Sequence, residues 1–459
     1  MRLSPDGHVH ACCVNDRFPL GRIGRDSLRD IWHGAPRAQL AAALDEGDFS
    51  LGCEDCGADH RLGQRRHTHA EAYDRYPQPT TPLAWPRRVE FALSNTCNLR
   101  CDMCNGDLSS AIRAQVEHRP PLPVVYDDAF FDEVRALLPH LEVAVFIGGE
   151  PFLSRECRRV WDLMLELGVE PEVHVTTNGT IWDDRVEHYV RALRMNVAVS
   201  IDGVSAEVNE AIRLGSDHAT VLANRDRLLA AVRSHGGGFT LNHCLLRANW
   251  HELVAFLLEA DRLDVDVHVI PVHYPRRASI FSLPAEEVAV IARAVATDPA
   301  ARRLGRNRAV WAEIVDHLEV YATGLEEGTA VAIGTTLSES AVESLRAELT
   351  GWAGQDPVAI HAPQGTIEAV EVAGWASELG LEALVGRPVE VIDEELVPRQ
   401  GLATERSGAG YHVLRYRHAQ PEGEAEFRTV VIPDWGILTV TTAPAVVAWR
   451  RSGSASGDC

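Results

Sequence analysis

The chain has 459 residues, of which 46% are hydrophobic and 24% are charged, and its formal net charge is −22. This acidic excess argues against non-specific binding to nucleic acid or to an anionic membrane surface. No apolar run approaches the roughly 18 residues of a membrane span, and the N-terminus lacks a signal-peptide pattern. Seven of the ten cysteines fall in clusters with metal-ligand spacing, which favours metal binding in a reducing compartment over disulfides. We therefore expect a cytoplasmic protein of about two to four domains.

The first 70 residues are predicted to form a small cysteine-rich module. A Pro-Asp-Gly turn at residues 5–7 predicts a hairpin, and Cys12 and Cys13 follow it. Two short helices are predicted at about 27–32 and 35–46, ahead of Cys53 and Cys56. The C-x2-C spacing presents two thiolates to one metal. Because neighbouring residues rarely both reach one metal, we expect either Cys12 or Cys13 to bind while the other packs.

Residues 71–88 contain several prolines and are predicted to be a semi-rigid linker, after which strands and helices alternate through residue 283. The predicted strands are 89–94, 142–148, 172–177, 196–201, 238–245 and 265–271, and the predicted helices are 107–117, 127–138, 154–168, 183–193, 217–234 and 250–262. Six strands alternating with helices imply parallel pairing and right-handed crossovers. The expected fold is α/β, a partial (β/α)6 barrel of the TIM type, in which chemistry collects at the C-terminal strand ends.

Cys97, Cys101 and Cys104 lie on the loop after the first predicted strand, at spacings of four and three residues. Such a loop can direct three thiolates at one centre and leave a fourth coordination position open. Soft thiolate ligands suit an iron–sulfur cluster or zinc. A four-iron cluster normally takes four cysteines, so three cysteines leave one iron free for a substrate or a cofactor.

The next strand ends carry further motifs. The second strand ends in Gly-Gly-Glu-Pro at residues 148–151, where paired glycines let the backbone approach a ligand, and a carboxylate or backbone carbonyl can accept from an ammonium. The third strand ends at Asn178-Gly179, and the fourth ends at Ser200, with Arg213 a short distance beyond. A guanidinium pairs bidentately with a carboxylate, so Arg213 is a candidate for carboxylate recognition.

C-x3-C-x2-C after a first strand, in company with these motifs, resembles the radical S-adenosylmethionine (SAM) enzymes. The resemblance implies that Cys97, Cys101 and Cys104 hold a [4Fe–4S] cluster and that SAM chelates its fourth iron. An electron from the cluster then cleaves SAM, and the 5′-deoxyadenosyl radical takes a hydrogen atom from the substrate. The same resemblance implies that SAM is bound by the residues at the matching motif positions: Gly148, Gly149, Glu150, Pro151, Asn178, Ser200 and Arg213. Met103 stands where the family usually has an aromatic residue.

The order of hairpin, double cysteine, Trp-containing helix and C-x2-C resembles the SPASM or twitch module, which implies an auxiliary [4Fe–4S] cluster held by Cys53, Cys56 and Cys12 or Cys13. Such modules have a further cysteine before the hairpin, and this chain has none there. Three explanations stay open: the natural start lies upstream, a histidine (His8, His10 or His60) substitutes, or the module holds zinc or uses only three ligands. A zinc knuckle without a redox role fits C-x2-C equally well.

Residues 284–352 are predicted to be helical, at about 284–296, 307–323 and 338–352, and residues 353–445 are predicted to form an α+β accessory domain. Its strands are expected at about 357–361, 366–372, 410–418, 427–432 and 435–442. Antiparallel strands around a short helix, with Leu-Val-Gly-Arg at residues 384–387, resemble PAS-type sensor or interaction domains. The alternative is a substrate-docking domain without a ligand. Residues 446–459 are predicted to be a disordered tail.

Three cysteines stand apart from the clusters. Cys244, in the fifth barrel strand, is expected to be a buried structural thiol, or a hydrogen-atom donor if it faces the barrel lumen. Its neighbours Asn242 and His243 are substrate-contact candidates by position alone. Cys157, on a helix, is expected to be inert, and Cys459 lies in the tail.

The predicted function is a radical SAM oxidoreductase or maturase that oxidises or cross-links a peptide or protein, served by an external electron donor of the flavodoxin or ferredoxin type. The alternatives are dehydrogenation of a small molecule, a non-catalytic iron–sulfur redox sensor, and a zinc-containing binding protein. The Gly-Gly-Glu-Pro motif favours the enzyme, because a sensor does not need a site for the SAM amino group. No nucleic-acid or membrane partner is expected.

Overall fold

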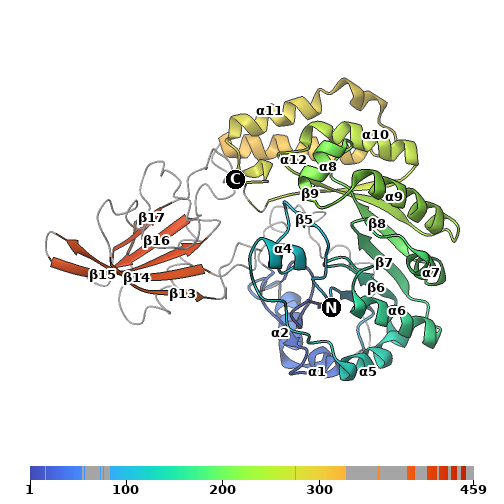
Figure 1. Ribbon diagram of the computed structural model, residues 1–459, viewed down its shortest axis with the longest axis horizontal. Helices are drawn as coiled ribbons and strands as arrows, with labels where there is room; N and C mark the ends of the chain where they lie inside the picture. The colour runs from blue at the N-terminus through green and yellow to red at the C-terminus, as the bar shows by residue number, and fades with distance from the viewer. Residues whose placement is uncertain are drawn as a thin grey trace. The chain divides into compact units, whose positions relative to one another are not determined.

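A computed structural model describes residues 1–15, 17–53, 83–273 and 277–326, the isolated positions 56, 73, 76 and 275, and the six C-terminal strands given below. The chain divides into two compact units, and residues 1–272 with 291–317 form the first. This unit contains the cysteine-rich module and the predicted barrel (Figure 1). Within the described residues, no helix is both long and apolar enough to span a membrane.

Six parallel strands form the centre of the first unit, and each overlaps a predicted strand. They are β4 (Arg88–Phe91), β6 (Val143–Phe146), β7 (Glu172–Thr177), β8 (Asn196–Ser200), β10 (Phe239–Leu245) and β11 (Asp266–Pro271). Each strand pairs in parallel with the one before it in this series. The parallel order agrees with the predicted α/β fold and its partial (β/α)6 barrel.

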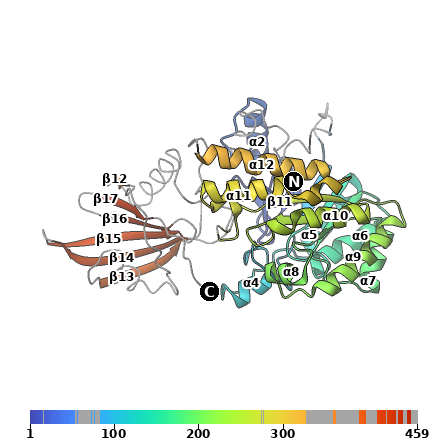
Figure 2. The ribbon, with the colours of Figure 1, turned by 90° about the horizontal axis from the view of Figure 1, so that it is seen from above.

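Helices cover the outer face of this sheet, with α6, α7 and α9 on the side of the strands away from α4 (Figures 1 and 2). The helices of the barrel are α4 (Ser110–Gln115), α5 (Asp128–Leu137), α6 (Arg155–Leu167), α7 (Asp184–Ala192), α8 (Ala206–Ile212), α9 (His218–Arg233) and α10 (Leu253–Leu263). Six of the seven begin at a Ser or Asp side chain that accepts from a backbone N–H: Ser109, Asp127, Ser154, Asp183, Ser205 and Asp217. Each such cap stabilises a helix by about 1 kcal/mol and fixes where it starts.

A chain of aromatic rings fills the core between the first strands and their helices. Phe91 on β4 stacks on Phe146 of β6 with 5.0 Å between centroids, and Phe146 meets the edge of Trp161 on α6 at 5.2 Å. Trp161 in turn contacts Tyr189 on α7 at 5.1 Å. These buried rings hold β4 and β6, whose C-terminal ends carry the site, in a fixed relation.

The cysteine-rich module extends the same sheet instead of standing apart from it. Its elements are β1 (Arg2–Leu3), β2 (His8–His10), β3 (Gly21–Arg22), α1 (Leu28–His33) and α2 (Ala35–Asp45), which confirm the predicted hairpin and helices. β1 pairs in parallel with β4, placing Arg2 opposite Glu90, and β2 and β3 follow in antiparallel order. The full order is therefore β11-β10-β8-β7-β6-β4-β1-β2-β3. The sequence did not predict this continuity.

The C-terminal part begins with α11 (Ala285–Ala296) and α12 (Arg308–Glu326), which match two of the predicted helices. Its sheet has the order β12-β17-β16-β15-β14-β13, with β12 (Ala359–His361), β13 (Glu390–Val397), β14 (Tyr411–Gln420), β15 (Gly423–Ile432), β16 (Gly436–Thr441) and β17 (Val446–Arg450). Four short 3-10 helices are also described: Leu138–His140, Trp250–Glu252, Ile280–Ser282 and Pro299–Arg303.

One C-terminal prediction is wrong. The tail was predicted to be disordered from residue 446, but Val446–Arg450 forms β17 and pairs with β16. The run of valine, alanine and tryptophan favours a strand, and the Ser- and Gly-rich end begins only after it. The predicted helix at 338–352, the strand at 366–372 and most of the linker at 71–88 lie outside the described residues. The resemblance to PAS-type domains stays a prediction.

Candidate active site

The loop that leaves β4, residues 94–106, carries the three predicted cluster ligands, and we call it the cysteine loop. Two serines at the start of α4 hold it. The Cys97 backbone N–H donates to Ser110 Oγ at 3.1 Å, and Ser109 Oγ donates to the Leu99 carbonyl at 2.7 Å. The Cys104 N–H donates to the Cys101 carbonyl at 3.0 Å, closing a tight turn between the last two cysteines. The serines fix the first half of the loop and the turn fixes the second.

The three thiols lie close enough for the charge of one to affect the others. Burial raises the pKa of Cys101 to about 11, an effect that Arg213 opposes, and it raises the pKa of Cys104 to about 12, with the Cys101 thiol adding to the shift. Burial also raises the pKa of Cys97. Three buried thiols do not ionise together without positive charge between them. Iron supplies that charge, so the donor set fits an iron–sulfur cluster.

Within the described residues, no three His, Cys, Asp or Glu side chains converge so that they could hold a single metal ion. A four-iron cluster binds each thiolate at a different iron and does not require that convergence. The result therefore does not bear on whether the cysteine loop holds a cluster.

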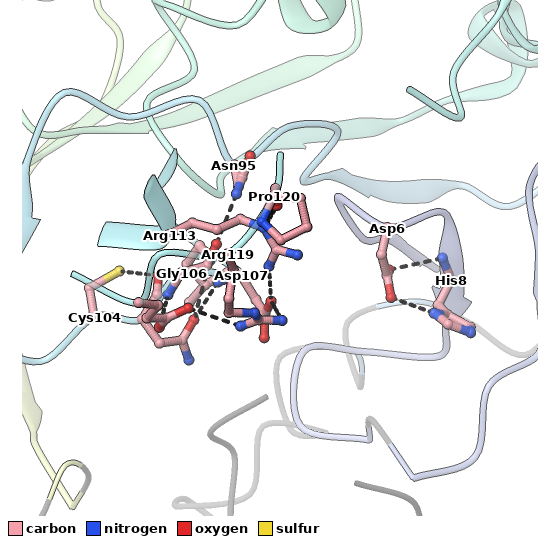
Figure 3. Close-up of polar contacts among 12 residues, drawn as sticks. Asp6, His8, Asn95, Cys104, Gly106, Asp107, Arg113, Arg119 and Pro120 are labelled. Carbon is pink, nitrogen blue, oxygen red and sulfur yellow. Dashed lines mark hydrogen bonds and ion pairs between the residues drawn. The ribbon is translucent and has the colours of Figure 1, made fainter. Parts of the chain in front are cut away.

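A polar network supports the loop behind Cys104 (Figure 3). Arg113 Nη1 lies 2.9 Å from Asp107 Oδ1, and Arg119 Nη2 lies 3.1 Å from the same oxygen. Asn95 Nδ2 donates to the Gly106 carbonyl at 2.9 Å, which joins the two ends of the loop. These bonds are satisfied within the protein, so we regard this network as support and not as a ligand site.

The glycines of the Gly-Gly-Glu-Pro motif bring the end of β6 against the cysteine loop. Gly149 has φ +51°, and a Cβ there would lie 2.5 Å from the Thr96 carbonyl oxygen; a Cβ on Gly148 (φ +80°) would lie 2.9 Å from Ala92 Cβ. The Glu150 N–H donates to the Thr96 carbonyl at 2.7 Å. The sequence predicted that these glycines let the backbone approach a ligand. In the structure, the atoms that a Cβ at either glycine would meet belong to the protein chain itself.

The Glu150 carboxylate is fully buried and faces three donors of the protein. Oε2 accepts from the Asn178 N–H at 2.7 Å, and Oε1 accepts from Thr177 Oγ1 at 2.9 Å and from the Phe152 N–H at 3.1 Å. Burial raises the pKa of Glu150 to about 7, and the three hydrogen bonds oppose the shift. The sequence left two candidate acceptors for an ammonium group, the Glu150 carboxylate and the backbone carbonyls of the motif. The carbonyls are the better placed, because the carboxylate already accepts three hydrogen bonds from the protein.

Asn178, at the end of β7, contacts the cysteine loop directly. Its Nδ2 donates to Asn98 Oδ1 at 3.0 Å and lies 3.9 Å from Cys97 Sγ, while its Oδ1 accepts from the Thr180 N–H at 2.9 Å. Asn178 therefore lies beside Cys97, the first predicted cluster ligand, at the strand end where the sequence predicted a cofactor contact.

Arg213 is brought to the cysteine loop by a short ribbon that the sequence did not predict. β5 (Arg100–Cys101) pairs antiparallel with β9 (Arg213–Leu214), and Cys101 lies opposite Arg213. The Arg213 side chain is only 8% exposed, and its Nε lies 2.7 Å from Asp202 Oδ2. This pair is an ion pair without hydrogen-bond alignment, since neither atom has a hydrogen-bond partner. Burial acts to lower the pKa of Arg213, but Asp202 and the nearby thiols outweigh it and keep the guanidinium charged.

Asp202 joins the ends of β8 and β10 and was missed as a site residue. It is fully buried, its Oδ1 accepts from the Cys244 N–H at 2.7 Å, and its Oδ2 faces Arg213. Its place just beyond the end of a parallel strand was the signal that could have identified it. Ser200, just before it, lies on the inner face of β8.

The alternation of buried residues along β10 identifies its two faces. Leu241, His243 and Leu245 are fully buried, and the His243 ring packs on Phe256 of α10 at 4.4 Å, so this face meets the helices. Thr240, Asn242 and Cys244 are part-exposed and line the inner face. Placing His243 as a substrate contact is therefore wrong, because strand pleating turns it away from the lumen. Asn242 and Cys244 face the lumen.

In the cysteine-rich module, Asn15 brings Cys12 and Cys53 together. Its backbone N–H donates to Cys12 Sγ at 3.4 Å, and its Nδ2 donates to Cys53 Sγ at 3.2 Å. Asn15 is 1% exposed, and Gly52 (φ +76°) leaves room for its side chain, since a Cβ there would lie within 2.3 Å of Asn15 Oδ1. Of the adjacent pair Cys12 and Cys13, this contact favours Cys12 as the partner of Cys53.

The remaining predicted ligands of the module are less closely defined. Cys13 and Cys56 are both part-exposed. His8 Nδ1 lies 2.6 Å from Asp6 Oδ2 at the hairpin turn (Figure 3), so this histidine is already engaged through one ring nitrogen. His60 lies outside the described residues.

Comparison with known families agrees with this geometry. Residues 91–260 match the model of the radical SAM superfamily, and residues 1–57 match that of the SPASM iron–sulfur cluster-binding domain. The chain therefore contains a radical SAM domain and, before it, a SPASM domain, as the motifs predicted. These domains bring a [4Fe–4S] cluster with SAM and an auxiliary cluster.

Individual relatives are distant. The AdoMet-dependent heme synthase of Methanosarcina barkeri is 26% identical over 213 residues, which cover 42% of this chain and 56% of the relative, so the chain spans about half the length of that curated relative. Among solved structures, native anSMEcpe with bound AdoMet is 16% identical over 45% of this chain and 58% of that chain, with a TM-score of 0.34. Streptococcus suis SuiB bound to precursor peptide SuiA is 11% identical over 56% of this chain and 61% of that chain, with a TM-score of 0.35.

Proposed function

We propose that this radical SAM enzyme oxidises or cross-links a peptide or protein in the cytoplasm and uses its SPASM domain to take up the electron that the substrate loses. One observation carries the proposal: β1 of the SPASM domain pairs in parallel with β4, the strand that leads into Cys97. The chain segment after β2 that carries Cys12 and the cysteine loop after β4 thus belong to one sheet, with β1 between the two strands. A fixed second redox site is what an oxidation needs, because a substrate that has lost a hydrogen atom must still lose an electron.

Each residue of the site has a role in this proposal. Cys97, Cys101 and Cys104 bind the [4Fe–4S] cluster, and Cys12, Cys53 and Cys56 bind the auxiliary cluster. When bound, the first cluster and SAM supply the one-electron chemistry that removes a hydrogen atom from an unactivated C–H bond. The backbone of residues 148–151 accepts from the SAM ammonium, with Glu150 anchoring that backbone to β7.

Arg213 pairs with the SAM carboxylate. Its ion pair with Asp202 is made through Nε, and the proposal assigns its two terminal nitrogens to the bidentate pair with the carboxylate. Asn178 and Ser200 stand at neighbouring strand ends, where they orient the ribose.

A peptide substrate is favoured by the C-terminal sheet. β13 ends the strand order there and is paired only with β14 among the described strands. An open strand edge can add an extended peptide through main-chain hydrogen bonds. This sheet would serve as a docking site, while the chemistry stays in the barrel.

The test is the iron and acid-labile sulfide content per chain after anaerobic reconstitution, in the wild type and in a Cys97/Cys101/Cys104→Ala triple variant. We expect about eight irons in the wild type and about four in the variant, since each cubane cluster has about four. The reduced wild type should cleave SAM to 5′-deoxyadenosine and the variant should not. If the triple variant contains no iron, the protein holds no auxiliary cluster, and the proposed electron acceptor is excluded.

A second function has one observation in its favour. The sequence relative is named as a heme synthase, so a small-molecule substrate is the alternative. The peptide and small-molecule functions are distinguished by measuring SAM cleavage in the presence of a size-fractionated cell extract. Stimulation by the retained, protease-sensitive fraction supports a peptide or protein, and stimulation by the filtrate supports a small molecule.

A further inference from the structure

Cys244 is a free thiol on the inner face of the barrel that the proposed cluster and SAM contacts do not use. Cys244 is the last of the three part-exposed residues of β10, after Thr240 and Asn242. No described residue makes a hydrogen bond to its sulfur. Its neighbours along the strand face the helices, so the thiol points to the same side as Ser200 on β8, whose register partner on β10 is Asn242. The thiol is therefore placed on the surface that a substrate would contact.

Two observations put this thiol beside the place where SAM would bind. The Cys244 N–H is bonded to Asp202, which in turn faces Arg213, and Arg213 lies opposite Cys101. The Cys244 sulfur is also within electrostatic range of the thiols of Cys101 and Cys104. Arg213 and Asp202 independently indicate a ligand here, because both side chains are more than nine-tenths buried and, among the described residues, Arg213 Nε and Asp202 Oδ2 have no hydrogen-bond partner.

The thiol is in the protonated form that can give up a hydrogen atom. Burial raises its pKa, and the carboxylate of Asp202 adds to the shift, although Arg213 opposes it. An S–H bond is weaker than an aliphatic C–H bond, so transfer of hydrogen from sulfur to a carbon radical is downhill. Cys157 has no such access, because it is buried on α6 against the outer face of the sheet.

We propose that Cys244 donates a hydrogen atom to carbon-centred radicals formed in the barrel lumen, an inference that rests on the proposed radical SAM chemistry. The S–H bond breaks homolytically, a C–H bond forms at the radical carbon, and a thiyl radical remains on Cys244. The thiol is restored by one electron from a reduced iron–sulfur cluster or from the external one-electron donor, together with one proton from solvent.

This step gives the substrate radical a second outcome. Loss of an electron to the auxiliary cluster oxidises the substrate, whereas return of a hydrogen atom from Cys244 leaves its oxidation state unchanged. Because the thiol proton exchanges with water, the returned hydrogen carries the isotope of the solvent.

The experiment uses the full-length, reconstituted protein with SAM in D2O, titanium(III) citrate as reductant, no added thiol and no substrate. Without a substrate, the 5′-deoxyadenosine that forms takes its new hydrogen from the nearest donor. We expect wild type to give 5′-deoxyadenosine with deuterium at carbon, and Cys244→Ala to lose that deuterium. Cys157→Ala is the matched control and should keep it. Equal deuterium in Cys244→Ala and wild type, or none in wild type, overturns the proposal.

A second readout does not depend on turnover. Methylmercury(II) chloride, which displaces the thiol proton and so does not need a preformed thiolate, is added to the folded, cluster-free protein, and the modified cysteines are mapped by mass spectrometry. We expect Cys244 to be modified while Cys157 stays protected, and equal protection of both overturns the lumen placement. If wild type does not cleave SAM at all, the proposed function fails on that result, and the labelling pattern still decides where the thiol of Cys244 lies.

Discussion

Cys101 and Arg213 are cross-strand partners in the β5–β9 ribbon, so a predicted cluster ligand and the predicted carboxylate-binding residue are held by one pair of backbone strands. Asp202, fully buried, fixes the guanidinium from its other side. Backbone pairing in the ribbon thus sets the distance between the predicted cluster site and the predicted carboxylate site. Loss of the guanidinium should therefore affect SAM binding without removing the cluster.

We expect Arg213→Lys to weaken SAM binding while iron content stays unchanged. Lysine keeps the positive charge beside Asp202 but loses the bidentate geometry, a loss of about 1.5–3 kcal/mol or roughly tenfold to a hundredfold in affinity. Equilibrium dialysis with S-adenosylhomocysteine, which keeps the amino-acid part and is not cleaved, measures this. Arg225→Lys is the control, because Arg225 is a buried, ion-paired arginine on α9. Unchanged affinity in Arg213→Lys would exclude the assigned role.

Gly149 and Gly168 offer a matched pair of substitutions. Both have positive φ, +51° and +62°, but a Cβ on Gly168 meets nothing within 4 Å, whereas one on Gly149 meets the Thr96 carbonyl at 2.5 Å. Gly168→Ala should cost only about 1–2 kcal/mol of backbone strain. Gly149→Ala must also displace the cysteine loop, so we expect it to lose iron as well as stability.

Urea unfolding of the cluster-free proteins and iron content after reconstitution measure the two effects separately. Full iron loading in Gly149→Ala would show that the cysteine loop does not depend on this contact. Iron loss in Gly168→Ala would show that general strain explains the result.

The barrel could be predicted from the sequence because its strands and helices alternate with clear apolar patterns, and the predicted ligands lie at strand ends as parallel topology requires. The β5–β9 ribbon could not, since strands of two residues have no periodicity to detect. Asp202 and Asn15 were missed for a related reason. Each is a short polar residue near a turn, and only tertiary contacts distinguish a buried anchor from a solvated turn residue. His243 was misplaced because position along a strand does not by itself say which face is inside.

Glu150 should make stability depend on pH. Its pKa is about 7 in the folded chain against 4.5 for the ordinary value, so the folded state binds the proton more tightly. The resulting stabilisation is complete below pH 4.5 and is lost as the pH rises through 7, by up to about 3 kcal/mol. We expect the unfolding free energy of wild type, relative to Glu150→Gln, to fall across this window.

Urea unfolding of the cluster-free proteins at several pH values measures the difference. Glu259→Gln is the control with the opposite sign, because the hydrogen bond from Arg262 lowers the pKa of Glu259 in the folded chain. Its stabilising contribution is present above the unfolded pKa and is lost toward acid pH. A flat difference for Glu150→Gln would mean that the three donors around the carboxylate fully offset its burial.

Asn15 should tune the auxiliary cluster. Its Nδ2–H donates to Cys53 Sγ at 3.2 Å, and hydrogen bonds to cluster sulfur favour the reduced, more negative state. In the Cys97/Cys101/Cys104→Ala background, where the auxiliary cluster is the one left, we expect Asn15→Leu to shift the midpoint potential to more negative values by about 60 mV, the value for a tenfold change in a one-electron equilibrium.

A redox titration followed by electron paramagnetic resonance measures the midpoint. Asn224→Leu is the control, since this buried amide donates to the Gly179 carbonyl and not to sulfur. It removes a comparable buried hydrogen bond in the barrel and should leave the midpoint unchanged. The same midpoint in Asn15→Leu and in the parent would show that Cys53 is not a ligand of the auxiliary cluster, or that its sulfur does not accept this bond when the cluster is bound. Either result would remove Asn15 as the residue that ties Cys12 and Cys53 to one redox site.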